Sequence, residues 1–317
     1  MSTLSIPADN DPGFDFKLLK RNDNHLVQGI LNSYLSRPGK NIRPLLIRHF
    51  GKIFRIEESE IQLLCRAAEL IHTASLIHDD VVDEASKRRG QTTLNVTQTN
   101  ARAVLAGDYL LARVVGELVQ AGQLGPLKGL SETLEDLVEG EFLQDDLKTK
   151  SNVSREDLIR VSSKKTGSLL GWCFSSVLLL KGADPSIVQK AQDAGVLLGI
   201  IFQMVDDNLD YCLHSGKEYG KDLKDGLINF TTLNLINLYP ELYYPIYSIK
   251  GKDFGEGPWS KEQIDAAISM TNQVASDKVT EVNRLLKDVF TENSKILDLE
   301  ATKELFEFID LLQKRIR

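Results

Sequence analysis

The positions of proline place the strongest constraint on how this 317-residue chain can fold. None of the nine prolines lies between Pro44 and Pro126, between Pro126 and Pro185, or between Pro185 and Pro240. Because proline interrupts the interior of a helix, these three intervals are free for long helices. Within them apolar residues recur at helical spacing, as over residues 61–75, and alternating runs of the strand type are nearly absent. The sequence therefore predicts an all-α protein.

Clusters of glycine, proline and polar residues predict where the helices end. They occur at residues 36–40, 122–126, 182–185, 214–226 and 251–258. None is long or biased enough to be a domain linker, so we expect a single helical domain over residues 1–317. Residues 261–317 read as two or more charged amphipathic helices that pack over the rest.

Charge and composition exclude several classes of protein. The chain has 38 Lys and Arg against 45 Asp and Glu, a formal charge of -7, which argues against binding to nucleic acid or to an anionic membrane surface. The longest apolar stretches, 169–180 and 196–205, are shorter than the roughly 20 residues needed to cross a bilayer, so we expect no membrane span. The N-terminus does not read as a signal peptide, and three scattered cysteines suggest neither disulfides nor a thiolate metal site. We expect a cytoplasmic protein.

Two acidic motifs of identical spacing indicate metal chemistry. Asp79, Asp80 and Asp83 lie in the segment IHTASLIHDDVVDE, and Asp206, Asp207 and Asp210 in FQMVDDNLDY, where they follow a buried helical run. On a helix, the first and last carboxylates of each motif share a face, where like charges repel unless a cation binds between them. One such motif alone is as easily a solvated acidic face. Two of them across a cleft could hold several Mg²⁺ ions, which implies a phosphate or diphosphate ligand.

Basic residues near these motifs support an anionic ligand. Arg88 and Arg89 follow Asp83, Lys40 and Arg43 lie in GKNIRP, and Lys164 and Lys165 precede Thr166. Each pair alone is most simply a solvated surface charge, but arginine and lysine together suit phosphate oxygens. P-loop, GxGxxG, HExxH and GxSxG motifs are absent from the sequence, so the usual nucleotide, dinucleotide, zinc protease and serine hydrolase chemistries are not supported.

With these segments, the chain resembles the trans-isoprenyl (polyprenyl) diphosphate synthases. The two acidic motifs are similar to that family's aspartate-rich motifs, and GKNIRP, AGDYLLA, GEFLQ and SKKTGSLL are similar to further family segments in the same order. The pair Ala74-Ser75 looks most like the long-chain bacterial enzymes of the octaprenyl type. The resemblance implies an all-α homodimer that uses Mg²⁺, three ions per active site, to condense an allylic prenyl diphosphate with isopentenyl diphosphate.

The resemblance also implies a role for each matching residue. The metal ligands, or the carboxylates directly behind them, would be Asp79, Asp80, Asp83, Asp206, Asp207 and Asp210. The allylic diphosphate would contact Arg88, Lys165 and Lys217, with Thr166 and Gln203 beside the reacting end. Isopentenyl diphosphate would contact Lys40, Arg43, His72 and Arg89. Metal ions and cations would stabilise the leaving diphosphate, so that no protein nucleophile or dedicated side-chain base is required.

Ala74 and Ser75 bear on product length. Ala74 lies five residues before Asp79, roughly 7 Å along a helix on the side away from the metals. In the family a bulky aromatic near this position stops the growing chain, so small residues here predict a product longer than fifteen carbons. Small residues that merely permit close helix packing are the alternative.

The chain departs from the family pattern after the second motif. Where the family usually has Gly-Lys-Pro-Thr, this chain has Gly226-Leu-Ile-Asn229, so Leu227 replaces a customary lysine, for which Lys221 or Lys224 could compensate. Pro38 also replaces a second glycine, and the short segment from Tyr211 to Lys217 makes Lys217 the least secure of the assigned cations. The loss of the lysine that Leu227 replaces keeps a regulatory subunit of a hetero-oligomeric synthase open as an alternative. A geranylgeranyl-length synthase and a terpene cyclase or squalene-type synthase are two further alternatives.

Overall fold

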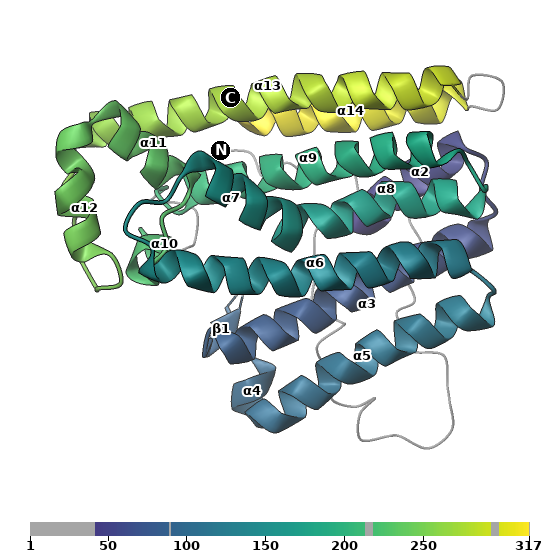
Figure 1. The fold of residues 1–317 in the computed structure, drawn as a ribbon, viewed down its shortest axis with the longest axis horizontal. Coiled ribbons are helices and arrows are strands. Elements are labelled where there is room, and N and C mark those ends of the chain that lie inside the picture. Colours follow the sequence, from purple (N-terminus) through teal and green to yellow (C-terminus); the bar gives the residue numbers. More distant parts are fainter. Residues whose placement is uncertain (1–41, 89, 213–217, 293–297, 317) are drawn as a thin grey trace. The chain divides into compact units, whose positions relative to one another are not determined.

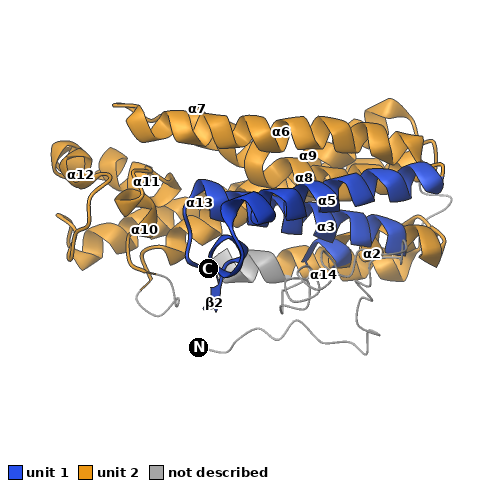
Figure 2. Cartoon of the chain, turned by 90° about the horizontal axis from the view of Figure 1, so that it is seen from below, with its two compact units in different colours: residues 1–44, 62–121 blue, residues 45–61, 122–317 orange. Residues whose placement is uncertain are grey.

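The computed structural model describes residues 42–88, 90–212, 218–292 and 298–316, and nearly all of them are helical. The chain divides into two compact units, residues 1–44 with 62–121, and residues 45–61 with 122–317 (Figure 2). The all-α prediction is confirmed. The single-domain organisation stays a prediction.

Helices end or begin near the breaks predicted at 122–126, 182–185 and 251–258 (Figure 1). In chain order they are α2 (Ile42–Ile53), α3 (Glu58–Val82), β1 (Lys87–Arg88), β2 (Gln91–Thr92), α4 (Leu94–Thr97), α5 (Asn100–Gln120), α6 (Leu124–Thr149), α7 (Arg155–Ser162), the π-helical turn η1 (Ser163–Gly167), α8 (Ser168–Leu180), α9 (Pro185–Leu209), α10 (Lys221–Lys224), α11 (Phe230–Leu238), the 3₁₀ turn η2 (Pro240–Leu242), α12 (Tyr243–Ile249), α13 (Lys261–Glu292) and α14 (Leu299–Ile316). The break predicted at 36–40 lies outside the described residues, as do residues 214–217 of the break predicted at 214–226.

The first unit is built on the pairing of α3 with α5. Buried apolar side chains lie on more than one face of α3, among them Ala68, Ile71 and Ile77. Gly107 of α5 lets His78 approach closely, because a Cβ at Gly107 would lie 2.2 Å from His78 Nε2. The two-residue strands β1 and β2 pair antiparallel directly after α3, a hairpin that the helical pattern of the sequence did not predict.

The second unit has α8 at its centre. This helix carries no charged residue, and its side chains from Ser168 to Leu178 are buried. It packs against α6 and α9, and α9 packs in turn against α13. Glycines allow the close approach of α8 and α9, since a Cβ at Gly195 would lie 2.4 Å from the Leu170 carbonyl oxygen. Trp172 and Phe174 are buried in this core.

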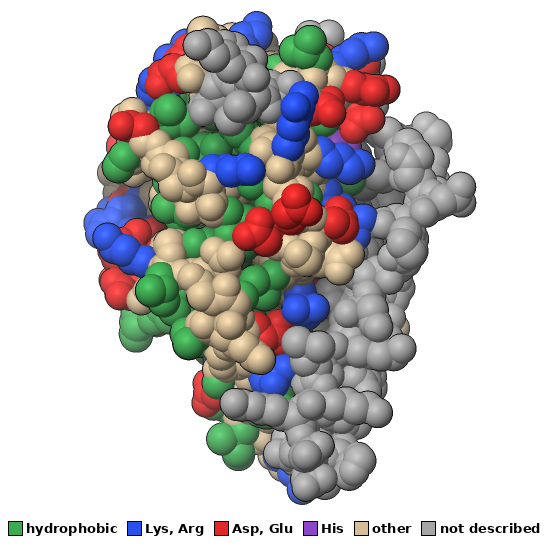
Figure 3. All heavy atoms as spheres, turned by 90° about the vertical axis from the view of Figure 1, so that its right-hand side faces the viewer, with side chains coloured by type: hydrophobic (Ala, Val, Ile, Leu, Met, Phe, Trp, Pro, Cys, Tyr) green, Lys and Arg blue, Asp and Glu red, His purple; other side chains and the backbone are tan. Residues whose placement is uncertain are grey.

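None of the described helices combines the length and the apolar character that a membrane crossing requires. On the face drawn in Figure 3, acidic and basic side chains are interspersed over the described surface, without a continuous basic patch.

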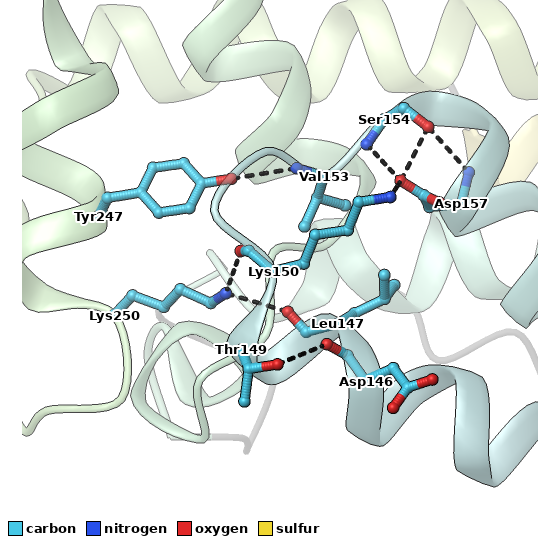
Figure 4. Close-up of polar contacts among 9 residues, drawn as sticks. All are labelled: Asp146, Leu147, Thr149, Lys150, Val153, Ser154, Asp157, Tyr247 and Lys250. Carbon is cyan, nitrogen blue, oxygen red and sulfur yellow. Dashed lines mark hydrogen bonds and ion pairs between the residues drawn. The ribbon is translucent and has the colours of Figure 1, made fainter.

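Residues from α12 and the loop after it form hydrogen bonds with the segment that connects α6 and α7 (Figure 4). The Lys250 ammonium donates to the carbonyl oxygens of Leu147 at 3.0 Å and Lys150 at 3.1 Å, and so caps the C-terminus of α6. The Tyr247 hydroxyl accepts a hydrogen bond from the Val153 amide at 3.2 Å. Burial lowers the pKa of Lys250. The connection matters because α6 and α7 carry residues of the site described below.

Replacing Lys250 by methionine should lower the free energy of unfolding by about 1 to 2 kcal/mol, because two carbonyl groups at the end of α6 lose their charged donor. Urea unfolding followed by circular dichroism measures this change. Lys252→Met is the matched control, since the exposed Lys252 donates only to Ser248 of its own turn, and it should cost less than about 0.5 kcal/mol. Equal effects of the two substitutions would contradict the capping role.

Candidate functional site

The first acidic motif lies at the end of α3, and its three carboxylates differ in exposure. Asp79 is half-buried, Asp80 is fully buried and Asp83 is exposed. The Asp83 amide donates to the Asp79 carbonyl at 2.8 Å, which continues the helical geometry for one more residue. Asp79 and Asp83 therefore share a helix face, as their spacing predicts.

Arg88 neutralises the buried member of this motif. Its Nε atom lies 2.6 Å from Asp80 Oδ1, and the hairpin of β1 and β2 brings it back to the end of α3. Asn95 donates to the backbone carbonyls of Asp80 and Ala85, each at 3.1 Å, and closes the same turn. Arg88, predicted to contact the allylic diphosphate, is thus also the ion-pair partner of Asp80.

The other predicted residues of the first unit lie on α3 and α2. Ala74 is fully buried, and the Ser75 hydroxyl donates to the His72 carbonyl of its own helix at 2.9 Å. Arg43 is half-buried in the first turn of α2. Lys40, Arg89 and Lys217 lie outside the described residues.

The second acidic motif ends α9 and belongs to the second unit. Asp206 is exposed, whereas Asp207 and Asp210 are each 3% exposed. Asp207 accepts hydrogen bonds from Gln203 Nε2 and from the Phe230 amide, both at 2.8 Å. Asp210 accepts from the amides of Lys221 at 3.1 Å and Asp222 at 3.3 Å, at the start of α10. The two buried carboxylates thereby fix the segment that follows the motif.

Asp207 lies in a strongly perturbed environment. Burial raises the pKa of Asp207 well above its ordinary value, and the nearby negative charge of Asp222 raises it further. Asn229 donates to Asp222 at 2.9 Å and accepts from the Thr232 amide at the start of α11. A perturbed carboxylate in a polar hollow is typical of a functional site.

A cavity of about 80 Å³ in the second unit brings four of the predicted residues together, Asp207 among them. Lys165, Thr166 and Gln203 all line it, and Thr166 Oγ1 donates to Gln203 Oε1 at 3.1 Å. The remaining lining residues are Gln144, Leu147, Leu158, Val161, Ser162, Asp207, Asp222, Leu227, Ile228, Asn229 and Phe230. The hydrogen-bonded series Thr166, Gln203, Asp207 and the Phe230 amide runs along this wall.

The π-helical turn η1 presents Lys165 and Thr166 to the cavity. It inserts between α7 and α8, where the sequence predicts continuous helix. Single π-turns within helices occur frequently at functional sites. The Lys165 ammonium is paired with Glu141 of α6, 2.7 Å from Oε1 and 2.8 Å from Oε2.

Leu227 occupies the cavity wall where the resemblance leads one to expect a lysine. Lys221 pairs with Asp225, and Lys224 pairs with Glu218 at 2.8 Å and Asp253 at 3.1 Å. Neither lysine lines the cavity. The compensation considered for Lys221 or Lys224 is therefore not seen among the described residues.

The donor set fits a hard divalent cation. Mg²⁺ is commonly held by one or two carboxylates, with waters and substrate phosphates in its other positions. Among the described residues no three acidic, histidine or cysteine side chains converge as a closed metal site. Each motif nevertheless contains carboxylates that are less buried than Asp80, Asp207 and Asp210: Asp79 and Asp83 in the first motif, and Asp206 in the second. Such a donor set suits a metal ion that is bound by these carboxylates and by the oxygens of a phosphorylated ligand.

Two residues of this site carry no role in the sequence analysis. Glu141 lies in GEFLQ, one of the segments that resemble the family, and Asp222 lies in the segment after the second motif. Glu141 lies close to Lys165, and Asp222 close to Asp207, only because segments distant in the sequence pack together. The local spacing of residues therefore does not predict a role for Glu141 or Asp222.

Comparison with known proteins identifies the family of this chain. Residues 24–256 match the family model described as polyprenyl synthetase. A decaprenyl-diphosphate synthase of Dictyostelium discoideum is 39% identical over 222 residues, which cover 68% of this chain and 48% of that protein. A prenyl transferase of Cyanidium caldarium is 32% identical over 301 residues, covering 91% of both chains. The chain spans about half the length of several of its curated relatives, as with the 53% of the human all trans-polyprenyl-diphosphate synthase that it matches.

The fold also resembles those of solved polyprenyl synthase structures. The crystal structure of a decaprenyl diphosphate synthase from Rhodobacter capsulatus superposes with a TM-score of 0.80 at 25% identity, over 95% of this chain and 94% of that one. A polyprenyl synthase from Caulobacter crescentus, complexed with calcium and isoprenyl diphosphate, superposes with a TM-score of 0.75 at 23% identity, over 93% and 89%. From the extent of the family match, the two aspartate motifs and the shared helical fold, the chain belongs to the polyprenyl synthetase family.

Proposed function

We propose that this protein is a Mg²⁺-dependent prenyltransferase, which condenses an allylic prenyl diphosphate with isopentenyl diphosphate to an all-trans product longer than fifteen carbons. The observation that carries the proposal is the meeting of Lys165, Thr166, Gln203 and Asp207 at one cavity. A cation, a hydroxyl, an amide and a carboxylate in one hollow suit a diphosphate whose neighbouring carbon becomes positively charged.

Metal ions would supply charge neutralisation to the leaving diphosphate, with three Mg²⁺ proposed per active site. Asp79, Asp83 and Asp206 are the proposed direct ligands because they are the least buried carboxylates of the two motifs. Asp80, Asp207 and Asp210 are proposed to hold the motifs in place through the contacts described above.

The remaining residues would bind and orient the substrates. Lys165, Arg88 and Lys217 are proposed for the allylic diphosphate, and Lys40, Arg43, His72 and Arg89 for isopentenyl diphosphate. Thr166 and Gln203 would direct their oxygen atoms toward the allylic carbon as positive charge develops there. The proton lost from isopentenyl diphosphate would leave with the released diphosphate.

A homodimer and a cytoplasmic location complete the proposal. Four apolar side chains on α5 are exposed, with Leu105 at 66%, Val119 at 52%, and Val104 and Val115 each at 39%. A row of this kind on one helix supports contact with a second copy. The three cysteines form no disulfide, which supports a reducing compartment.

Incubation of the purified chain with Mg²⁺, isopentenyl diphosphate and each allylic starter tests the proposed reaction, with product length read by chromatography. We expect elongation beyond fifteen carbons, and none when the metal is chelated. Absence of elongation with every starter would contradict the catalytic proposal. Activity that appears only after addition of a second chain would instead favour the regulatory-subunit alternative, which the replacement of lysine by Leu227 keeps open.

The two kinds of carboxylate in the first motif should respond differently to neutralisation. Asp83→Asn should lower kcat on the order of a hundredfold with little change in stability, because Asp83 is exposed and proposed to bind metal. Asp80→Asn should lower the free energy of unfolding by about 2 kcal/mol, because Arg88 loses the partner of a buried ion pair. Paired kinetic and unfolding measurements check both. The reverse pattern would contradict the assignment.

Ala74→Phe should shorten the product, since an aromatic ring at this buried position would block the space proposed for the growing chain. Product chromatography measures the effect. Overpacking by itself costs about 1 to 3 kcal/mol, so Ala68→Phe serves as the control: Ala68 is equally buried on another face of α3. An unchanged product from Ala74→Phe, or the same shortening from Ala68→Phe, would contradict the chain-length role.

A further inference from the structure

We propose that Gly140 and Glu141, neighbours on α6, are positioning residues that set where the Lys165 ammonium meets a diphosphate. The inference rests on the proposed function, because it takes Lys165 as a group that contacts this ligand. Gly140 acts through the backbone of the π-turn and Glu141 through the side chain.

The two adjacent lysines of η1 are separated by their partners on α6. Lys164 pairs with Asp136 at 2.6 Å and Glu139 at 2.8 Å, and Arg160 binds the same Glu139 at 2.9 Å. Hydrogen bonds to these two carboxylates raise the pKa of Lys164. Lys165 pairs with Glu141 and lines the cavity, whereas Lys164 does not. Acidic residues of α6 therefore hold Lys164 away from the cavity and Lys165 at its wall.

The backbone of η1 is held closely on two sides. A Cβ at Gly140 would lie 2.8 Å from the Lys165 amide nitrogen and 3.1 Å from Lys165 Cα. On the side of α9, a Cβ at Gly199 would lie 2.5 Å from Gly167 Cα. Neither position has room for a methyl group unless backbone moves. The position of Lys165 along the cavity wall therefore depends on glycine at residue 140.

The carboxylate of Glu141 fixes the end of the Lys165 side chain. Both Glu141 oxygens lie within 2.8 Å of Lys165 Nζ. The Glu141 side chain is 30% exposed and the Lys165 side chain 23%. A diphosphate that approaches this ammonium meets a competing anion already in place. Glu141 should therefore orient Lys165 for the reaction and, at the same time, weaken the binding of the free anion.

Glu141→Gln separates these two effects in the full-length protein. Calorimetric titration with inorganic diphosphate and Mg²⁺ should show binding at least about threefold tighter, because a competing charge is removed. Steady-state kinetics should show kcat about tenfold lower, because the ammonium is no longer held in position. Glu139→Gln is the matched control, since it makes the same change beside Lys164, and neither quantity should move more than about twofold.

Gly140→Ala tests the backbone contact. It should weaken diphosphate binding and lower kcat, each by about tenfold, because the turn that carries Lys165 must shift. Gly129→Ala on the same helix is the control, since its Cβ would meet only side-chain atoms at 3.5 Å or more. Circular dichroism establishes that both variants fold.

The outcomes separate this inference from the proposed function. If the wild-type chain binds diphosphate and Glu141→Gln behaves like Glu139→Gln, the positioning role is wrong and the function stands. If Glu141→Gln changes both quantities but Gly140→Ala matches Gly129→Ala, the backbone part is wrong. If the wild-type chain binds no diphosphate in the presence of Mg²⁺, the proposed function is wrong, and the inference fails with it.

Discussion

Each acidic motif depends on hydrogen-bond donors for its buried carboxylates. Asp80, Asp207 and Asp210 are at most 3% exposed, and an unpartnered carboxylate in such a place would be strongly destabilising. The donors come from the chain that follows each motif: Arg88 of β1 for Asp80, the Phe230 amide for Asp207 and the Lys221 amide for Asp210. Each motif thus organises the segment after it, while its other carboxylates are less buried.

Close helix contact produces the second part of the site. Glycines on α6, η1 and α9 allow backbones to approach until no added methyl group fits, and the π-turn between α7 and α8 is held there. The same turn presents Lys165 and Thr166 to the cavity, where Thr166, Gln203 and Asp207 are joined by hydrogen bonds. The five residues Ser163–Gly167 therefore both pack against neighbouring helices and carry side chains that line the cavity.

The sequence predicts the fold well because proline and helical spacing are local signals. The all-α class, the breaks near residues 182–185 and 251–258, and the two C-terminal helices follow from them. The three carboxylates of each motif look alike in the sequence, and spacing predicts which share a helix face but not which are buried. The η1 turn and the pairing of Lys165 with Glu141 also escaped prediction, because both arise from contacts between helices distant in the sequence.

A crystal structure with Mg²⁺ and inorganic diphosphate tests most directly the claim that burial divides the carboxylates into metal ligands and structural residues. We expect metal within about 2.1 Å of carboxylate oxygens from Asp79, Asp83 and Asp206. We also expect Asp80 still paired with Arg88, and Lys165 bound to a diphosphate oxygen. Direct ligation by Asp80 or Asp207, or a diphosphate bound away from Lys165, would contradict these expectations.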